Sequence, residues 1–312
     1  MRSYLCHKTD KSFELNGRLD KEPWTEALWT EDFVDIEGDV KPKPRFRTRA
    51  KMLWNDEFLF IGAEMEEPHV WAYQTEHDSV IFHDNDFEVF IDPNGDNQLY
   101  GEFEMNARNT TWDLLLVKAY RDGGPAINGW EIKGIRTAVH IDGTLNDPSD
   151  TDRGWSVEIA MPWKALGEIA SRPSPPNEGD QWRIDFSRVE WHVDVVDGKY
   201  VRVAGRPEDN WVWSPQGAVD MHRPWTWGCV QFTSKPFGQG SIRPLDGLEE
   251  RTALMKICEA QRVYRKQTGH WAKTLKDLGV YPPGANLYVT PSLYEATIGD
   301  WHVDSSSRLW KS

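Results

Sequence analysis

The chain has 312 residues, enough for one large β domain or for one domain with an appendage. Hydrophobic residues make up 39% and charged residues 28%, proportions that argue against wholesale disorder. The formal net charge of −14 disfavours nucleic acid and anionic membrane surfaces as partners, since both bind clustered Lys and Arg. No segment is long and apolar enough to span a bilayer, so membrane insertion is not expected.

Short strands separated by turns occupy the first 230 or so residues. Between them lie turn residues, as in Asp92-Pro93-Asn94-Gly95-Asp96. Strand and helix patterns do not alternate, which favours an all-β, antiparallel β-sandwich of the jelly-roll or immunoglobulin-like type. Alternating or β-branched and aromatic residues predict strands at Lys51–Trp54, Phe58–Glu64, Phe87–Ile91, Glu102–Ala107, Trp155–Met161 and Trp182–Val189.

The pattern changes near Pro236. A helix is expected from Asp246 to about Gln267, opened by a capping box of Asp246 and Glu249. A second helical piece, Lys273–Leu278, stops at a glycine. A β-like tail follows. The sequence therefore predicts two units: a sandwich over residues 1–234 and a small α+β extension over residues 235–312 that packs on it.

Two residue types need a structural explanation. The three cysteines lack metal-ligand spacing, so buried thiols are expected, although one disulfide remains open. They are Cys6, Cys229 and Cys258. The 17 tryptophans exceed what is ordinary, because Trp serves both cores and the stacking of sugar rings. Most are expected in the core.

The richest segment is a predicted hairpin of Asp86–Asp92 and Tyr100–Asn106. Because side chains alternate along a strand, one face of this hairpin meets the core and the other carries acids. Glu88 is expected opposite Glu104, and Asp86 opposite Asn106. Opposed carboxylates lie roughly 5 Å apart at Cβ and destabilise a sheet, unless cations or a ligand compensate. The alternative is a solvated acidic face. Aromatic residues that accompany the cluster are Phe82, Trp112, Trp191, Trp211 and Trp213.

Four segments together resemble the family 9 carbohydrate-binding modules. The N-terminal run Leu15–Asp20 with Trp24, the strand Lys51–Phe60, the strand Asp86–Asp92 and the strand Trp155–Trp163 follow the family pattern in order and spacing. The resemblance covers about Phe13 to Phe232. It looks closest to stand-alone family 9-like proteins, and it implies a β-sandwich that binds sugar ends between two aromatic side chains.

The resemblance also implies roles for individual residues. Glu88 matches a sugar-binding Glu of the family, and Phe82 stands where the xylanase modules have Trp. The Arg expected on the next strand is replaced by Glu104 or shifted to Arg108, which puts xylan or cellulose specificity in doubt. The second aromatic is expected from the loop before the last strand, with Trp213 preferred over Trp211 and Trp225.

Location and cofactors are likewise expectations. The resemblance implies an extracellular or periplasmic protein of polysaccharide breakdown; residues 1–13 lack the apolar core of a signal peptide, so a cytoplasmic protein stays open. No cofactor is required. A structural calcium ion is usual in the family, and its candidate ligands are Asp92, Asn94 and Asp96, whose spacing equally suits a plain turn. A second acidic loop holds Asp147, Asp150 and Asp152.

Three functional hypotheses follow. The first is non-catalytic recognition of a mono- or oligosaccharide by Phe82, Glu88, Glu104, Asn106, Arg108, Trp112, Trp191, Trp211, Trp213 and His222. The second is a glycoside hydrolase-like enzyme with Glu88, Glu104 and His222 as catalytic groups, since such enzymes pair two carboxyls. The third, haem held by His83 and Met65, has nothing that fixes its geometry. The oligomeric state and the sugar are not indicated.

Overall fold

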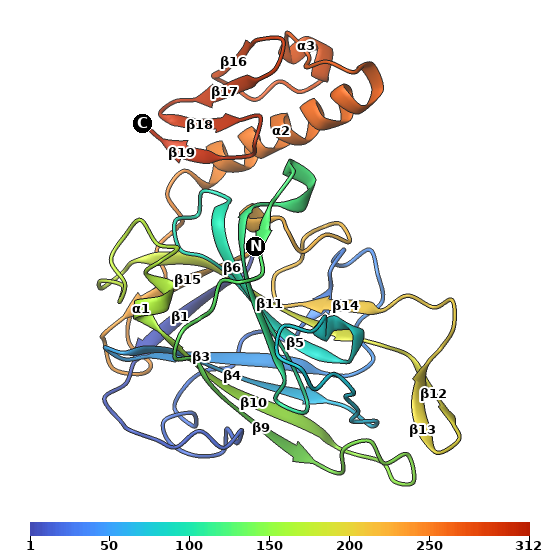
Figure 1. Ribbon diagram of the computed structural model, residues 1–312. Helices are drawn as coiled ribbons and strands as arrows, with labels where there is room; N and C mark the ends of the chain where they lie inside the picture. The colour runs from blue at the N-terminus through green and yellow to red at the C-terminus, as the bar shows by residue number, and fades with distance from the viewer.

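Apolar residues at alternate positions give the protein one curled sheet whose two halves enclose a core (Figure 1). The computed structural model describes residues 1–312. The first half has the order β8-β7-β6-β5-β11-β15, and β14 pairs with β11 and with β2. Its strands are β2 (Val34–Asp35), β5 (Asp86–Asp92), β6 (Gln98–Asn106), β7 (Thr111–Lys118), β8 (Ala126–Ile127), β11 (Gln181–Glu190), β14 (Asp209–Val212) and β15 (Gly228–Thr233).

The second half has the order β3-β4-β10-β9, and β1 joins the two halves. The predicted β-sandwich is confirmed, but the sheet is mixed rather than purely antiparallel. The reason is β1, which runs parallel to both of its neighbours, β15 and β3. The strands concerned are β1 (Ser3–Lys8), β3 (Thr48–Trp54), β4 (Phe58–Glu66), β9 (Arg136–Asp142) and β10 (Gly154–Pro162).

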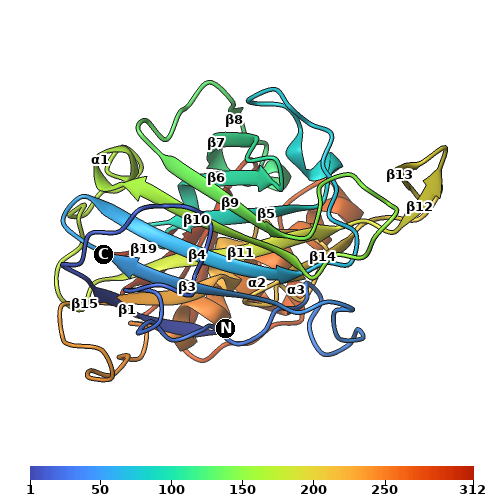
Figure 2. The same ribbon diagram turned by 90° about the horizontal axis from the view of Figure 1, so that it is seen from below.

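Four short helical turns and one projecting hairpin complete the sandwich. Figures 1 and 2 show the hairpin extending away from the body of the protein. The turns connect strands; η1 and η2 carry residues of the cavity described below, and η3 follows the last of them. These elements are η1 (Ile81–His83), η2 (Tyr120–Asp122), η3 (Pro224–Thr226), α1 (Trp163–Leu166) and the hairpin of β12 (Val193–Val196) with β13 (Lys199–Arg202).

The main core holds 35 buried residues from both halves of the sheet. Phe87, Val89 and Ile91 of β5 lie in it with Phe103 and Met105 of β6, so the predicted inward face of the hairpin is confirmed. Eleven of the 17 tryptophans are buried, which confirms that most of them are core residues. All three cysteines are buried free thiols, as predicted.

The C-terminal unit packs on one end of the sandwich, as Figures 1 and 2 show from two directions. Its small core of eight buried residues joins α2 to a four-stranded sheet. The predicted capping box is wrong: Gly247, with φ of 64°, is the N-cap, and Asp246 instead pairs with Lys311 at 2.9 Å. The elements are α2 (Leu248–Thr268), α3 (Leu275–Leu278), β16 (Ala285–Val289), β17 (Tyr294–Ile298), β18 (Trp301–Asp304) and β19 (Leu309–Lys311).

Polar contacts fix the C-terminal unit to the β5–β6 hairpin. The side-chain amide of Asn97 donates to the carbonyl of Ser307 at 2.9 Å, and the N–H of Leu309 donates to the carbonyl of Asp96 at 3.0 Å. Arg251 of α2 donates to the carbonyl of Gly95. These bonds join the tip of the hairpin to both the helix and the sheet of the unit.

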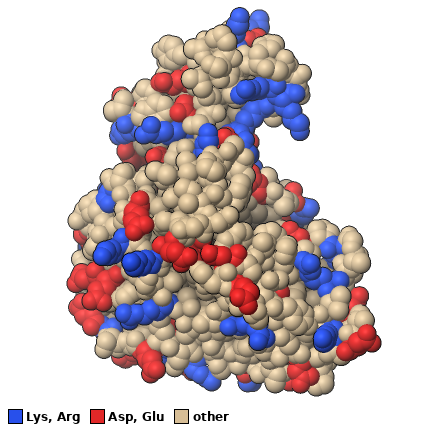
Figure 3. Space-filling model, viewed as in Figure 1, with Lys and Arg blue, Asp and Glu red and all other residues tan.

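Surface charges are interspersed over much of the face in Figure 3, with basic side chains gathered along one edge of the C-terminal unit. The acidic net charge therefore does not form one continuous field on this face. None of the helices is long and apolar enough to cross a membrane.

Candidate functional site

A cavity of about 330 Å³ lies on the outer face of β5, β6 and β7, beneath the segment 219–222. It is called the Glu88 pocket here. Its wall combines carboxyl groups with aromatic and aliphatic side chains, which is the mixture expected of a site for a small polar ligand. The lining residues are Ile36, Phe82, Glu88, Phe90, Glu102, Glu104, Trp112, Tyr120, Val189, Glu208, Asn210, Val219, Asp220, Met221 and His222.

The floor of the pocket is formed by acidic side chains from β5 and β6. The register places Glu88 opposite Glu104 and Asp86 opposite Asn106, as predicted, and it also places Phe90 opposite Glu102. Carboxylate oxygens of Asp86, Glu88 and Glu104 all lie within 4.8 Å of one another. Alternation accounts for this, because the residues between them face the core.

Burial dominates the electrostatics of this floor. It raises the pKa of Glu88 to about 7, and it raises the pKa values of Asp86, Glu102 and Glu104 well above the ordinary range. Neighbouring carboxylates add to the shift at Asp86, Glu102 and Glu104. Asp86 Oδ1 accepts from the N–H of Val189 at 3.1 Å, but its Oδ2 and the Oε2 of Glu102 are buried without a hydrogen-bond partner.

Aromatic rings border the acids. Phe82 comes from η1, Trp112 from β7 beside Glu104, and Tyr120 from η2. Phe82 and Trp112 are half-buried and Tyr120 is 51% exposed, so these rings reach solvent or a ligand. The N–H of Phe82 donates to Oε2 of Glu104 at 3.1 Å, which fixes this ring beside the floor.

His222 closes one side of the pocket. Its Nδ1 lies 2.9 Å from the hydroxyl of Tyr100, and its ring meets that of Tyr120 edge-on at 4.6 Å. Burial lowers the pKa of His222 to about 4, only partly offset by Asp220. The imidazole is therefore neutral near pH 7 and serves as a hydrogen-bonding group in the wall.

Five of the ten predicted ligand-binding residues meet in this pocket: Phe82, Glu88, Glu104, Trp112 and His222. The structure places the preferred Trp213 and its alternative Trp211 elsewhere. Trp211 and Trp213 are 3% and 0% exposed and belong to the main core. Alternation explains the error, since Asn210 lines the pocket whereas Trp211 and Trp213 turn into the core.

Three further predicted residues lie outside the pocket. Asn106 is fully buried; its Oδ1 accepts from the N–H groups of Arg108 and Thr110, and its Nδ2 donates to Asp84 and to the carbonyl of Gln74. Arg108 follows the end of β6 and is exposed at a different hollow, beside β9. The indole of Trp191 donates to the carbonyl of Phe82 at 2.9 Å. It therefore supports the aromatic wall from behind.

Sequence reasoning missed several lining residues, chief among them Tyr120, Glu208, Asn210 and Asp220. The sequence indicates that Asn210 faces away from the core, because this polar residue is followed by the apolar Trp211, which lies on the opposite side of the strand. Val212, the next residue, pairs with β11. The others come from loops and a short helical turn. Their approach to the pocket depends on chain paths that no local pattern indicates.

The predicted calcium ligands do not fit a metal ion. Both oxygens of Asp92 accept backbone N–H bonds, from Asn94 and Gly95 and from Asn97, at 2.8–3.1 Å. Asn94 Oδ1 accepts from Ser171, and Asp96 Oδ1 accepts from the N–H of Gln98. These oxygens are used to build the turn of the β5–β6 hairpin. Burial raises the pKa of Asp92 to about 7.

The second acidic loop and the haem candidates are also placed. Asp152 accepts from the N–H groups of Val70 and Thr144, and Asp150 from the hydroxyl of Thr144. Asp147 accepts from Ser149. Met65 is buried in the main core from β4, whereas His83 is exposed on η1. No observation joins Met65 and His83 into a haem site.

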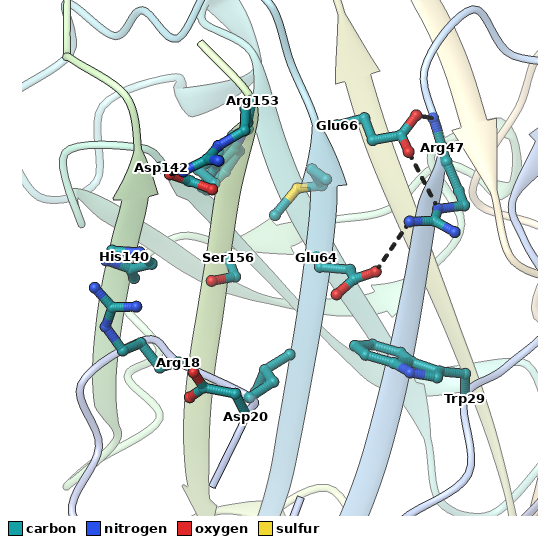
Figure 4. Close-up of a pocket in the computed structure, with 14 residues that line it drawn as sticks. Arg18, Asp20, Trp29, Arg47, Glu64, Glu66, His140, Asp142, Arg153 and Ser156 are labelled. Atoms are coloured by element: carbon teal, nitrogen blue, oxygen red, sulfur yellow. Dashed lines mark hydrogen bonds and ion pairs between the residues drawn. The ribbon is translucent and has the colours of Figure 1, made fainter. Parts of the chain in front are cut away.

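A separate cavity of about 450 Å³ lies on the outer face of β3, β4, β10 and β9 (Figure 4). Its charged groups are largely paired: Arg47 lies 3.5 Å from Glu64 and 3.4 Å from Glu66, and Arg153 pairs with Asp142. Trp29, a half-buried aromatic of this cavity, has the cations of Arg49 and Lys51 over its ring at 4.0 and 4.1 Å. This face has the character of a solvated ion-pair surface, so the Glu88 pocket is the better candidate.

Comparison with solved structures identifies relatives of the fold. A candidate carbohydrate-binding protein from Bacteroides uniformis is 18% identical, with a TM-score of 0.53 over 74% of this chain and 99% of its own. A family 9 carbohydrate-binding module from Caldicellulosiruptor kristjanssonii in complex with cellotriose is 15% identical, with a TM-score of 0.49 over 78% of this chain and 100% of its own. A family 9 module from the same organism in complex with glucose is 14% identical, with a TM-score of 0.48 over 76% and 100%.

Comparison with curated proteins finds no match. The family comparison is informative: the model described as carbohydrate family 9 binding domain-like matches residues 15–211, more than half of the chain. The matched region includes both strands of the pocket floor and the ring of Phe82. The resemblance seen in the sequence is thereby confirmed, and this chain belongs to the carbohydrate family 9 binding domain-like proteins.

Proposed function

We propose that this protein binds a mono- or oligosaccharide in the Glu88 pocket without transforming it. The observation that carries the proposal is the arrangement of Phe82, Trp112 and Tyr120 around buried, opposed carboxyl groups in a cavity of about 330 Å³. Family membership supports it, since the family is one of carbohydrate-binding domains. The pocket size is at the lower end of the range for small-ligand sites.

Each part of the wall has a function toward a sugar. Aromatic rings offer flat apolar surfaces for the C–H faces of a pyranose. Carboxylates accept hydrogen bonds from hydroxyl groups, and a charged acceptor makes a stronger bond than a neutral one. Because the pKa of Glu88 is about 7, its protonated and ionised forms are both populated at neutral pH. The protonated form donates a hydrogen bond, and the ionised form accepts one. The amide of Asn210 supplies a further donor and acceptor.

Glycoside hydrolysis is less well supported. It requires two carboxyls about 5–5.5 Å or 6.5–9.5 Å apart on either side of the scissile bond, one protonated and one ionised. Here Glu88 and Glu104 lie next to each other on one floor, and burial shifts the pKa of both in the same direction. Neutral His222 does not separate their roles. The placement of both glutamates on one floor therefore favours binding over hydrolysis.

A binding screen with product analysis tests the proposal. Wild-type protein, Glu88→Ala and Glu64→Ala would be applied to a glycan array, with titration calorimetry of every hit. Glu64 is the control because it lies in the other cavity, beside Arg47. We expect binding by wild type and Glu64→Ala, loss with Glu88→Ala, and recovery of intact ligand. A cleaved ligand would establish an enzyme instead, and equal binding by all three proteins would remove the Glu88 pocket from consideration.

We infer further that the protein acts outside the cytoplasm, on poly- or oligosaccharides undergoing breakdown. Family membership supports this inference, because carbohydrate-binding modules act where their polymers are found. Immunodetection in separated cytoplasmic, periplasmic and culture fractions of the producing cells tests it. Detection confined to the cytoplasmic fraction would overturn it.

A further inference from the structure

The Glu88 pocket has an unusual balance of charge. Five carboxyl-bearing residues line it, and no Lys or Arg does. They are Glu88, Glu102, Glu104, Glu208 and Asp220. Only Asp220 has an ion pair, with Arg121 at 3.4 Å. Four carboxyl groups of the pocket therefore have no counter-ion within the protein.

Two oxygens of this cluster also have no hydrogen-bond partner. Glu102 is 6% exposed and lines the pocket, and its Oε2 accepts no hydrogen bond. The Oδ2 of fully buried Asp86, a member of the trio with Glu88 and Glu104, is likewise unpartnered. An unsatisfied buried polar group destabilises the folded state, and more so if it is charged. A bound, positively charged hydrogen-bond donor would supply both the missing counter-ion and the missing hydrogen bonds.

We propose that the Glu88 pocket selects a sugar that carries a protonated amine, such as a 2-amino-2-deoxyhexose or an oligomer of it, over neutral and acidic sugars. The inference rests on the proposed function and specifies its ligand class. An ammonium group supplies three N–H donors and one positive charge to the acidic floor. The rest of the pyranose ring lies against Phe82 and Trp112.

The aromatic wall favours an organic cation over a bare metal ion. Rings within about 6 Å of a cation attract it through their π faces, and the same rings stack on a sugar. A calcium ion instead requires six to eight oxygen ligands. The trio of Asp86, Glu88 and Glu104 provides three carboxylates, and the pocket wall beside it is formed by Phe82, Phe90 and Trp112.

Binding of a cation has a thermodynamic consequence that binding of a neutral sugar lacks. An ammonium group stabilises the ionised floor, so carboxyls that are protonated in the free pocket release protons on binding. The titratable groups that line the pocket are Glu88 from β5, Glu102 and Glu104 from β6, Tyr120 from η2, and Glu208, Asp220 and His222 from loops. Buried Asp86 lies beside Glu88 and Glu104, and Arg121 lies behind Asp220.

Titration calorimetry with defined sugars tests the inference. Glucosamine, N-acetylglucosamine, glucose and glucuronic acid would be compared at pH 6, where an amine with an ordinary pKa of about 7.7–8 is protonated. Each titration would be run in two buffers of different ionisation enthalpy. We expect glucosamine to bind at least tenfold more tightly than N-acetylglucosamine, with net proton release. Glu102→Gln and Glu104→Gln should reduce that preference, whereas Glu64→Gln should retain it.

The outcomes separate this inference from the proposed function. Equal affinity for glucosamine and glucose, with both lost in Glu88→Ala, would overturn the inference and leave carbohydrate binding intact. No binding of any sugar would overturn both. Binding of calcium chloride alone, lost in Glu104→Gln, together with sugar binding only in the presence of calcium, would replace the ammonium group by a metal ion. The ranking of sugars by wild type decides the question even if a Gln variant does not fold.

Discussion

The backbone N–H of Phe82 donates a hydrogen bond to Oε2 of Glu104, 3.1 Å away, and so joins the aromatic wall of the Glu88 pocket to its acidic floor. Phe82 belongs to a short helical turn that precedes β5, and Glu104 lies in β6. The acid that faces the ligand therefore also positions the ring that would stack on it. The indole of Trp191 holds the same turn through the carbonyl of Phe82.

Removal of the Phe82 ring should weaken sugar binding without unfolding the protein. The ring is only half-buried, so Phe82→Ala exposes little of the core. We expect affinity to fall roughly tenfold, about 1.4 kcal/mol, because one stacking surface is lost. Calorimetry on Phe82→Ala and on Tyr281→Ala, a 68% exposed residue of the C-terminal unit, measures this. Equal affinity of both variants would show that Phe82 does not contact the sugar.

Stability should fall as pH rises from about 4.5 to about 7. Folded Glu88 keeps its proton up to a pKa of about 7, whereas its unfolded value is 4.5. The folded state therefore binds more protons in this window, and the free energy of unfolding decreases with pH. Burial of Asp92 and Asp113, with pKa values of about 7 and 6, acts in the same direction.

Urea unfolding of wild type and Glu88→Gln at several pH values checks this dependence. Gln cannot ionise, so Glu88→Gln should have the shallower slope, with a difference of up to about 3 kcal/mol at pH 7.5 and above. Lys11→Ala, at an exposed position, should have the wild-type slope. A wild-type free energy of unfolding that increases steadily over this window would contradict the prediction.

A buried ion network at one end of the sandwich should contribute strongly to the free energy of unfolding. Arg188 is fully buried and lies 2.8 Å from both Glu67 and Glu190, and Asn85 donates to the same two carboxylates. Arg188→Met leaves two buried acids without their cation, which should cost about 3–5 kcal/mol. Arg153→Met breaks the exposed pair with Asp142 and should cost less than about 1 kcal/mol. Chemical denaturation of the two variants compares them; similar losses would refute the distinction.

The β5–β6 turn should be stable without calcium. Asp92 accepts three backbone N–H bonds across the turn, and these are lost in Asp92→Ala. We expect destabilisation of about 1–3 kcal/mol, from the unpaired N–H groups, that is the same in calcium and in chelator. Melting curves of both proteins under the two conditions measure this. A calcium-dependent rise in Tm that disappears in Asp92→Ala would show that the turn binds the ion after all.

Most of the fold could be predicted from the sequence, because local patterns of residues determine its strands and turns. Alternation in β5 and β6 determined which side chains face the core, and the short turn between the strands determined their register. That is why Glu88 and Glu104 were placed correctly opposite each other. The parallel pairing of β1 was not accessible, since residues 3–8 meet their partners only through contacts across the whole chain.

Only half of the predicted pocket residues were correct, because the local sequence pattern does not specify contacts between distant segments. Trp213 was misplaced because residue type does not tell a core tryptophan from a ligand-stacking one; the side of the strand does. Arg108 was misplaced because the chain turns after Asn106. Tyr120 and Asp220 reach the pocket from segments whose positions depend on one another, through the pair of Asp220 with Arg121. No local pattern specifies such a contact.

Helix α2 holds η2 at both residues that follow Tyr120, through Glu259 to Arg121 and through Arg262 to Asp122. A wall of the pocket is therefore anchored by a segment that lies beyond the family-matched residues 15–211. A fragment that ends after β15 would keep every strand of the sandwich, but η2 would lose both ion pairs to α2 and keep only that of Arg121 with Asp220. We therefore expect the smallest fragment with full ligand affinity to include the C-terminal unit, which holds this wall of the pocket in place.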